Sequence, residues 1–336
     1  MIASYQRPYL MLEIRARTKA HDVAVVSPAD FETGLAGTAD HIDQLDAKLP
    51  YCFDAAAERV LYADTPDMAR ALAAAFLYQG QYTGAQRLLS VPLERFLDLE
   101  PAGPITPTFV LSISRCGSTL LSALLRHAGH PSASEPDLYT QVAAMSADQR
   151  ARTGHAGRLA LVRGCTAALA RQLGAGVVIK LRDHCNDIAE LLAEAVPEAR
   201  IAFMLRDRLG WANSRHRAFA DPPQALADLL ARGVRTYDAL VRGGHRPVLV
   251  WYEDLVADPL ATLGRLGVST TTLDAAGLAG LLSRDAQDGT SISQRNTGGR
   301  RLSDEARQAF EAAWNAAAPR DMLRRHGLER LLPTSD

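Results

Sequence analysis

Short apolar runs alternate with longer amphipathic stretches over the second two-thirds of the chain. The apolar runs are continuous and of strand length, as in strands buried on both faces of a sheet: residues 108–113, 177–179, 201–205 and 247–251. The stretches between them repeat apolar residues at helical spacing: residues 120–127, 187–195, 209–219 and 224–241. This alternation predicts an α/β fold in which a parallel sheet is flanked by helices.

The first hundred residues show a mixed pattern. It predicts a short strand over 23–26 and helices over 67–77 and 83–89. A cluster of proline and glycine over 101–107 is typical of a domain boundary, and equally of a stiff loop inside one domain. We therefore expect an N-terminal mixed extension over residues 1–104, of open role, and an α/β domain over residues 105–336.

A phosphate site is predicted where the first of these apolar strands ends. Residues 114–119, which we call the phosphate loop, form a small glycine-containing turn between this strand and a helix. A helix N-terminus has unpaired N–H donors and a dipole that favours anions, and Arg115 adds positive charge. In the alternative interpretation, Ser118 and Thr119 only cap an ordinary helix.

Three further candidates directly follow apolar strands: Lys180, Arg206 and Tyr252. In an open parallel sheet, ligands bind beyond the carboxyl ends of the strands. These residues are therefore predicted to lie along the same sheet edge as the phosphate loop.

Composition narrows the class of protein. The 336 residues are 47% hydrophobic and 22% charged, with a formal net charge of −1, as expected for a globular enzyme rather than a disordered chain. No overall charge points to nucleic acid or to an anionic membrane, and no apolar run has the length of a membrane span. The N-terminus lacks the pattern of a secretion signal, and the four cysteines have no metal-like spacing, so we expect a cytoplasmic protein with reduced thiols.

The phosphate loop differs from a Walker nucleotide loop. It has no Gly-Lys pair, and no predicted strand ends in an aspartate that would supply a magnesium ligand. These differences predict a phosphate-bearing ligand handled without a metal. They count against a kinase-like phosphotransferase, which stays as an alternative.

Three motifs resemble those of sulfotransferases that use 3′-phosphoadenosine 5′-phosphosulfate (PAPS). Residues 114–121 resemble the 5′-phosphosulfate loop in the R-S-G-[ST]-T-L form of the bacterial and tyrosylprotein-type enzymes. Residues 203–214 look like the family's 3′-phosphate motif, a strand ending in Arg-Asp with a serine eight residues after the arginine. Residues 250–255 are similar to its Y-E-D-[LM] segment. The resemblance covers about residues 108–300 and implies the sulfotransferase fold, a P-loop-like parallel sheet flanked by helices.

The resemblance implies a set of residues that bind PAPS as sulfuryl donor. It assigns the 5′-phosphosulfate to the phosphate loop, the 3′-phosphate to an arginine and a serine, and the adenine to a tyrosine: Arg115, Cys116, Gly117, Ser118, Thr119; Arg206, Ser214; and Tyr252. A basic loop over residues 291–301 is expected near the 3′-phosphate, with Arg295 as the preferred candidate. Cys116 replaces the usual serine and is better explained as a small packing residue.

The resemblance also implies catalytic groups. Glu135 lies at nearly the interval of the catalytic glutamate in tyrosylprotein-type relatives and is the expected general base. His184 competes for this role, because cytosolic relatives use a histidine after the second strand, although their K-x-H spacing is not present here. Lys180 and Arg115 are expected to stabilise charge on the bridging oxygen.

The acceptor and the oligomeric state stay open at this stage. A small-molecule or peptidyl hydroxyl group would accept the sulfuryl group, and neither nucleic acid nor a membrane is expected as partner. A non-catalytic nucleotide-binding module is the third alternative.

Overall fold

The computed structural model describes residues 7–39, 48–99, 103–270, 273–293, 295–298 and 300–332. The chain divides into two compact units that are interleaved in sequence. Unit 1 comprises Met1–Pro107, Pro131–Leu181 and Glu194–Ala199, and unit 2 comprises Thr108–His130, Arg182–Ala193 and Arg200–Asp336. A division into domains at residue 104 remains a prediction.

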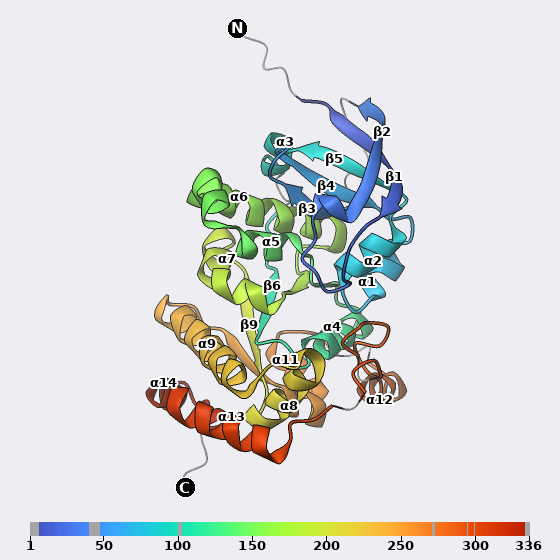
Figure 1. The fold of residues 1–336 in the computed structure, drawn as a ribbon. Coiled ribbons are helices and arrows are strands. Elements are labelled where there is room, and N and C mark those ends of the chain that lie inside the picture. Colours follow the sequence, from blue (N-terminus) through green and yellow to red (C-terminus); the bar gives the residue numbers. More distant parts are fainter. Residues whose placement is uncertain are drawn as a thin grey trace. The chain divides into compact units, whose positions relative to one another are not determined.

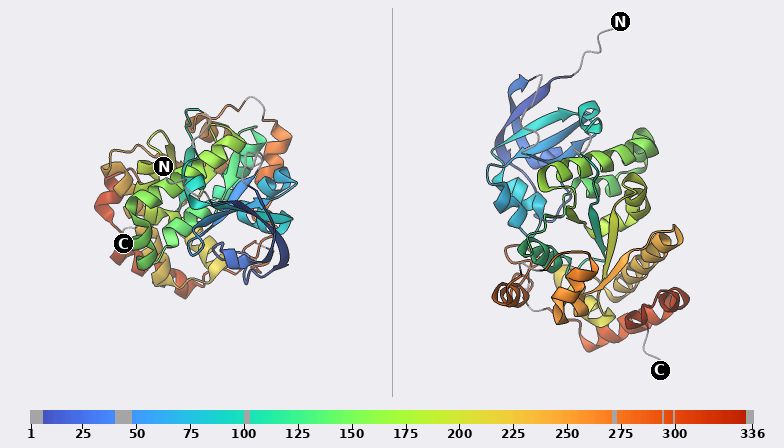
Figure 2. Two further views of the ribbon diagram at one scale, coloured as in Figure 1. Left: turned by 90° about the horizontal axis from the view of Figure 1, so that it is seen from above. Right: turned by 180° about the vertical axis from the view of Figure 1, so that it is seen from behind.

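Unit 1 contains a five-stranded antiparallel sheet with the order β2-β1-β5-β4-β3. Its strands are β1 (Tyr9–Arg17), β2 (Phe31–Ala39), β3 (Leu49–Asp54), β4 (Arg59–Asp64) and β5 (Arg87–Pro92). Strands β3, β4 and β5 are buried over most of their length, because helices cover this part of the sheet. Figures 1 and 2 show this twisted sheet in blue to cyan, with green helices beside it.

Two sequence predictions in this region are wrong. Residues 87–92 form strand β5 instead of continuing a helix, because pairing with β1 and β4 places Leu88 and Val91 in the core. Residues 23–26 form a turn and an extended segment without strand pairing. The backbone N–H of Val26 donates instead to Asp137, at 2.9 Å.

The helices of unit 1 are α1 (Met68–Ala73), α2 (Leu77–Gly84), α3 (Leu93–Leu97), α5 (Leu138–Ala144) and α6 (Ala147–Leu173), together with the 3-10 helix η1 (Pro28–Asp30). Ser146 and Gln149 form a capping box at the start of α6, and Gly154 interrupts it with φ +67°. A Cβ at Gly164 would collide with Phe96, so this glycine lets α6 approach α3. Both α5 and α6 pack against β3 (Figure 1).

The predicted parallel sheet is confirmed, with the order β10-β9-β6-β8-β7. Its strands are β6 (Thr108–Ser112), β7 (Ser132–Ser134), β8 (Val178–Lys180), β9 (Arg200–Leu205) and β10 (Val248–Trp251). The pairs β10–β9, β9–β6 and β8–β7 are parallel. Strand β7 has only three residues, which explains why the apolar pattern did not reveal it.

The predicted helices after residue 108 are also present. The helical elements around the parallel strands are α4 (Ser118–His127), η3 (Asp183–Ile188), α7 (Ala189–Ala195), α8 (Arg208–Phe219), α9 (Pro223–Arg242), α10 (Tyr252–Ala257), α11 (Pro259–Arg265), α12 (Ala275–Ser283), α13 (Asp304–Ala317), α14 (Arg320–Arg325) and η4 (Glu329–Leu331). The stretch 187–195 differs from the prediction, because its first two residues close the 3-10 helix η3 before α7 begins.

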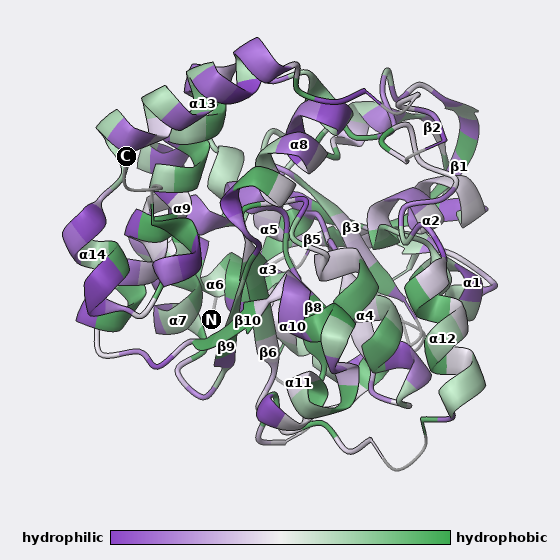
Figure 3. Ribbon diagram, turned by 90° about the horizontal axis from the view of Figure 1, so that it is seen from below, coloured by the Kyte–Doolittle hydropathy of each residue, from purple (hydrophilic) through white to green (hydrophobic). Residues whose placement is uncertain are grey.

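Helices α9 and α13 of unit 2 each bury one face. Helix α13 packs along α9 through Phe310 and Trp314, which are fully buried. Figure 3 shows the resulting pattern, with hydrophobic residues predominating on α4 and mixed green and purple residues on α13. Asp238 of α9 accepts a hydrogen bond from His326 at 2.8 Å, which fastens the end of α14 to this layer. Over the described ranges, none of the helices is long and apolar enough to cross a bilayer.

Candidate functional site

Each of the five parallel strands is followed by a residue that the sequence analysis selected. The phosphate loop follows β6, and Arg206 and Tyr252 follow β9 and β10 in unit 2. In unit 1, Lys180 is the last residue of β8 and Glu135 directly follows β7. The selected residues therefore form two groups, one in each unit.

The phosphate loop has an unusual backbone. Ser114 and Arg115 have φ values of +58° and +54°, in the left-handed region that non-glycine residues rarely adopt. Gly117 also has a positive φ, of +81°, and a Cβ there would collide with the ring of Tyr252. Such a conformation costs on the order of 1–3 kcal/mol at each non-glycine residue and persists only where the surroundings enforce it.

Helix α8 supplies the bonds that enforce it. The guanidinium of Arg215 donates to Ser114 Oγ at 2.6 Å and to Asp183 at 2.8 Å. The indole Nε1 of Trp211 donates to the carbonyl oxygens of Ile113 and Ser114, at 3.3 and 3.1 Å. These contacts hold the turn in shape before any ligand arrives, which favours binding by preorganisation.

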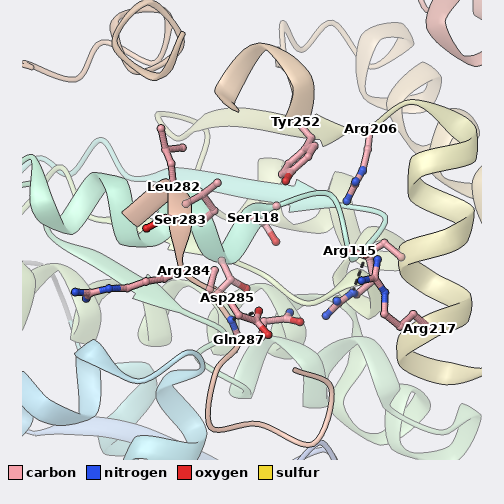
Figure 4. Close-up of a pocket in the computed structure, with 15 residues that line it drawn as sticks. Arg115, Ser118, Arg206, Arg217, Tyr252, Leu282, Ser283, Arg284, Asp285 and Gln287 are labelled. Carbon is pink, nitrogen blue, oxygen red and sulfur yellow. Dashed lines mark hydrogen bonds between the residues drawn. The ribbon is translucent and has the colours of Figure 1, made fainter. Parts of the chain in front are cut away.

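A polar cavity of about 270 Å³ opens over the phosphate loop within unit 2 (Figure 4). Its walls come from the loop, α8, the start of α10 and the segment after α12: Arg115, Gly117, Ser118, Thr119, Leu120, Arg206, Ser214, Arg217, Tyr252 and residues 282–287. Seven of the residues selected from the sequence thus line one cavity. Figure 4 shows Arg115, Arg206 and Arg217 extending into it from one side.

The cavity carries excess positive charge. Burial lowers the pKa of the Arg115 guanidinium to about 10. The Asp285 carboxylate opposes this shift, whereas three neighbouring guanidinium groups add to it, those of Arg217, Arg206 and Arg215. Since crowded, buried cations are relieved by a bound anion, the electrostatics of the cavity favour a multiply charged anionic ligand.

Two buried donors of this cavity make no hydrogen bond within the described part of the chain. The Nε atoms of Arg206 and Arg217 are buried and make no hydrogen bond there. Arg206 also stacks on Tyr252, with its guanidinium carbon 4.2 Å from the ring centroid, and lies 3.9 Å from the carboxylate of Glu253. Burial and the neighbouring Asp207 raise the pKa of Glu253. Phosphate oxygens would satisfy these guanidinium donors.

The side chain of Arg115 extends from the phosphate loop to α8. Its Nε donates to Ser214 Oγ at 3.3 Å, and its Nη1 donates to the carbonyl oxygen of Ile292, also at 3.3 Å. Ser214 is buried on the cavity wall. The contact links the loop motif to the Arg-and-Ser motif.

The second group is an ion pair inside unit 1. The ammonium of Lys180 pairs with the carboxylate of Glu135, and both side chains are nearly buried. The backbone N–H of Glu135 donates to the carbonyl oxygen of Lys180 at 2.7 Å. Glu135 has φ +56° and precedes a proline, so it too adopts an uncommon backbone conformation. The structure therefore brings the expected base and the expected charge-stabilising lysine into direct contact.

The competing base, His184, lies on η3 in unit 2 and is about half exposed. Its Nδ1 lies 3.1 Å from the Asp183 carboxylate, which Arg215 also contacts. Burial would raise the pKa of Asp183, but the hydrogen bond with His184 and the ion pair with Arg215 hold it well below its usual range. Asp183 therefore remains ionised and anchors both partners.

Two selected residues lie outside the cavity wall. Arg295 is exposed in a turn, and the buried thiol of Cys116 donates to the carbonyl oxygen of Ser114 at 3.3 Å. Burial raises the pKa of this thiol, so it stays neutral. Their assignment to donor binding remains a prediction.

The sequence analysis missed three contributors to the site. Arg217 follows Ser214 by three residues on α8, a helical spacing that could have indicated it. Arg215 lies next to Ser214 but acts on the loop. Residues 282–287 show no motif or periodicity in the sequence that would have indicated a binding role. Across the described ranges, no group of three or more His, Cys, Asp or Glu side chains is arranged to hold a metal ion.

Comparison with known proteins identifies the family. Residues 107–269 match the sequence model of the sulfotransferase family. This segment belongs to the sulfotransferase family. For this segment, the match confirms the predicted sulfotransferase class and fold.

Three solved structures are similar to this chain. The sulfotransferase domain of the Synechococcus PCC 7002 olefin synthase is 23% identical, with 60% of this chain and 86% of that chain covered and a TM-score of 0.38. STF9 from Mycobacterium avium is 16% identical, with coverages of 67% and 79% and a TM-score of 0.41. STF1 from Mycobacterium tuberculosis H37Rv is 17% identical, with coverages of 69% and 78% and a TM-score of 0.31. A comparison with curated protein sequences gives no match.

Proposed function

We propose that this sulfotransferase binds PAPS in the cavity of unit 2 and transfers its sulfuryl group to an acceptor hydroxyl. One observation carries the proposal. Residues from three separate motifs line a single cavity that is rich in arginine and contains buried guanidinium donors that make no hydrogen bond to any described residue. A nucleotide with phosphate groups at both ends supplies the matching acceptors.

Each part of the donor has a candidate partner. The backbone N–H groups and hydroxyls at the start of α4 would hold the 5′-phosphosulfate, because a helix N-terminus favours anions. Arg206 and Ser214 would bind the 3′-phosphate, with Arg217 as a further donor. The ring of Tyr252, which already stacks on Arg206, would border the adenosine.

Glu135 and Lys180 would perform the proton transfer and the charge stabilisation. The acceptor oxygen attacks sulfur, its proton passes to the Glu135 carboxylate, and the bond between sulfur and the bridging oxygen breaks. The electron pair of that bond stays on the 5′-phosphate, where Lys180 stabilises the developing charge. The products are a sulfate ester and adenosine 3′,5′-bisphosphate.

A binding measurement tests the donor assignment. Adenosine 3′,5′-bisphosphate should bind with measurable heat and raise the melting temperature, whereas magnesium-ATP should do neither. Arg206→Gln should abolish most of this discrimination, and Arg232→Gln, an exposed arginine of the same unit, should leave it intact. Preferential binding of magnesium-ATP would refute the proposal and favour a kinase-like phosphotransferase.

A transfer assay tests the chemistry. Incubation with isotopically labelled PAPS and a panel of phenols, sugars, lipids and peptides should give a labelled sulfate ester with at least one hydroxyl acceptor. Donor binding without transfer to any member of the panel, or to any component of a cell extract, would favour a non-catalytic binding module.

A further inference from the structure

An aromatic ring of unit 1 covers the Glu135–Lys180 ion pair. The ammonium of Lys180 lies 5.1 Å from the ring centroid of Phe76, within the range of a cation–π interaction. Phe76 is 2% exposed and Lys180 is 4% exposed. In such a dry setting the attraction is stronger than at a surface, because little water competes for the cation.

Neighbouring residues fix the position of the Phe76 ring. Phe76 and Tyr78 stack in parallel, with centroids 5.7 Å apart and an interplanar angle of 1°. The backbone next to Phe76 is fixed by Ser134 Oγ, which donates to the carbonyl oxygen of Ala75 at 2.7 Å. Since Ser134 directly precedes Glu135, one short segment carries both the expected base and the anchor of the aromatic residue.

The stack continues to a second buried lysine. The ammonium of Lys19 lies 5.2 Å from the Tyr78 ring centroid and pairs with Asp30 at 3.1 Å. Asp30 also accepts a hydrogen bond from Tyr51 at 2.6 Å. Both Phe76 and Tyr78 therefore interact with a lysine that is neutralised by a carboxylate. This arrangement fixes the aromatic pair more firmly than apolar packing alone.

We propose that Phe76 is a positioning residue that holds the Lys180 ammonium in the direction needed at the reacting sulfuryl group. This inference rests on the proposed catalytic role of Lys180. A lysine has four flexible side-chain torsions, and its ion pair with Glu135 fixes the ammonium at one point only. The ring of Phe76 restricts the remaining freedom. Phe76 lies outside residues 107–269, so the N-terminal region contributes to catalysis through a residue that the family match does not include.

Kinetics of Phe76→Leu test this role. The substitution keeps an apolar side chain but removes the ring face, and we expect kcat to fall about three- to thirty-fold, the rate equivalent of a buried cation–π contact. The Kd of adenosine 3′,5′-bisphosphate should stay within twofold. Phe76→Tyr, which keeps the ring, should retain most of kcat.

The matched control is Phe96→Leu. Phe96 is fully buried in the same unit and contacts the Tyr62 ring edge-on. Its replacement should reduce stability without reducing kcat per folded molecule. The inference would be overturned if Phe76→Leu kept the kcat of the wild type. It would also be overturned if Phe96→Leu lost as much kcat as Phe76→Leu.

Lysine NMR gives a readout that does not depend on sulfuryl transfer. The chain has only three lysines, Lys19, Lys48 and Lys180, so selective labelling at Cε yields three signals. The ε-methylene protons of Lys180 should be shifted upfield by the Phe76 ring, and this shift should disappear in Phe76→Leu, while the signal of Lys48 stays unchanged. Absence of the shift in the wild type would overturn the inference. Presence of the shift in a protein without transfer activity would instead count against the proposed function alone.

Discussion

The two groups of candidate residues treat positive charge in opposite ways. In unit 2, the cations on the cavity wall are arginines; the Asp285 carboxylate acts on Arg115, and that of Glu253 lies 3.9 Å from Arg206. In unit 1, each of the three lysines pairs with a carboxylate, as Lys180 does with Glu135. The cavity therefore has charge left for a ligand, whereas the ion pairs are internally balanced.

This difference suits the arginines of unit 2 to ligand binding and the lysine–carboxylate pair of unit 1 to the chemical step. Arginine stays charged under crowding and presents planar donors that fit phosphate oxygens, so it suits an open anion site. Lysine is a compact charge that one carboxylate and one ring can hold in place. A balanced pair at a strand end is suited to act on the reacting atoms while contributing little to ground-state affinity.

The largest effect is expected from Glu135→Gln, which tests whether the ion pair of unit 1 acts in the chemical step. The amide keeps the size of the side chain and an oxygen for Lys180 but accepts no proton at neutral pH. We expect kcat to fall about one-hundred- to ten-thousand-fold, with the Kd of adenosine 3′,5′-bisphosphate unchanged. Steady-state kinetics and calorimetry on the same preparation measure both quantities.

Asp64→Asn provides the matched control for Glu135→Gln. Asp64 ends strand β4 of the antiparallel sheet and pairs with the nearly buried Lys48 at 3.0 Å. This variant should lose stability and keep its kcat. If Glu135→Gln retained kcat within threefold, Glu135 would not be the base, and His184→Asn would become the next variant to measure.

Arg206→Gln tests whether the cavity of unit 2 binds the 3′-phosphate. Loss of a charge-assisted contact costs about 1.5–3 kcal/mol, so the Kd of adenosine 3′,5′-bisphosphate should rise about ten- to one-hundred-fifty-fold. Adenosine 5′-monophosphate, which lacks the 3′-phosphate, should lose much less affinity. An equal loss of affinity for both nucleotides would show that Arg206 contacts the 5′-phosphate instead of the 3′-phosphate.

The donor cavity could be predicted from the sequence to a larger extent than the surroundings of the ion pair. Arg115, Arg206 and Tyr252 each follow a continuous apolar strand, and local patterns of this kind survive folding. Lys180 was selected in the same way, but its ring partner Phe76 is more than a hundred residues away in the sequence. Contacts of such long range leave no periodicity.

The N-terminal region shows the same limit. Its antiparallel sheet pairs Leu10 of β1 with Ser90 of β5, far apart in the sequence, and the local pattern predicted a helix up to residue 89. Pairing and burial of Leu88 and Leu89 overrode that preference. Helix α6 went undetected because its charged first half obscures the apolar face of its second half.

A smaller effect is expected from Arg215→Lys. Lysine keeps the charge but cannot bond Ser114, Asp183 and Asp221 together, as the planar guanidinium does. The phosphate loop should then lose part of its preorganisation, with a rise in Kd of about three- to tenfold measured by calorimetry. Arg208→Lys, on the same helix but bonded to Glu311, is the control. Equal affinities in both variants would show that the loop holds its shape without Arg215.

The smallest effect concerns stability against pH. The pKa of Asp183 is lowered in the folded protein relative to its usual value near 3.9, so its ion pairs stabilise the fold above about pH 4 and lose this contribution as the pH falls further. The difference in unfolding free energy between wild type and Asp183→Asn should therefore be largest near neutrality and shrink below about pH 4. Urea unfolding at several pH values measures it, with the exposed Asp187→Asn as a reference that stays flat. A difference independent of pH would mean that Asp183 contributes through packing and neutral hydrogen bonds, and that the charge on the loop anchor is dispensable.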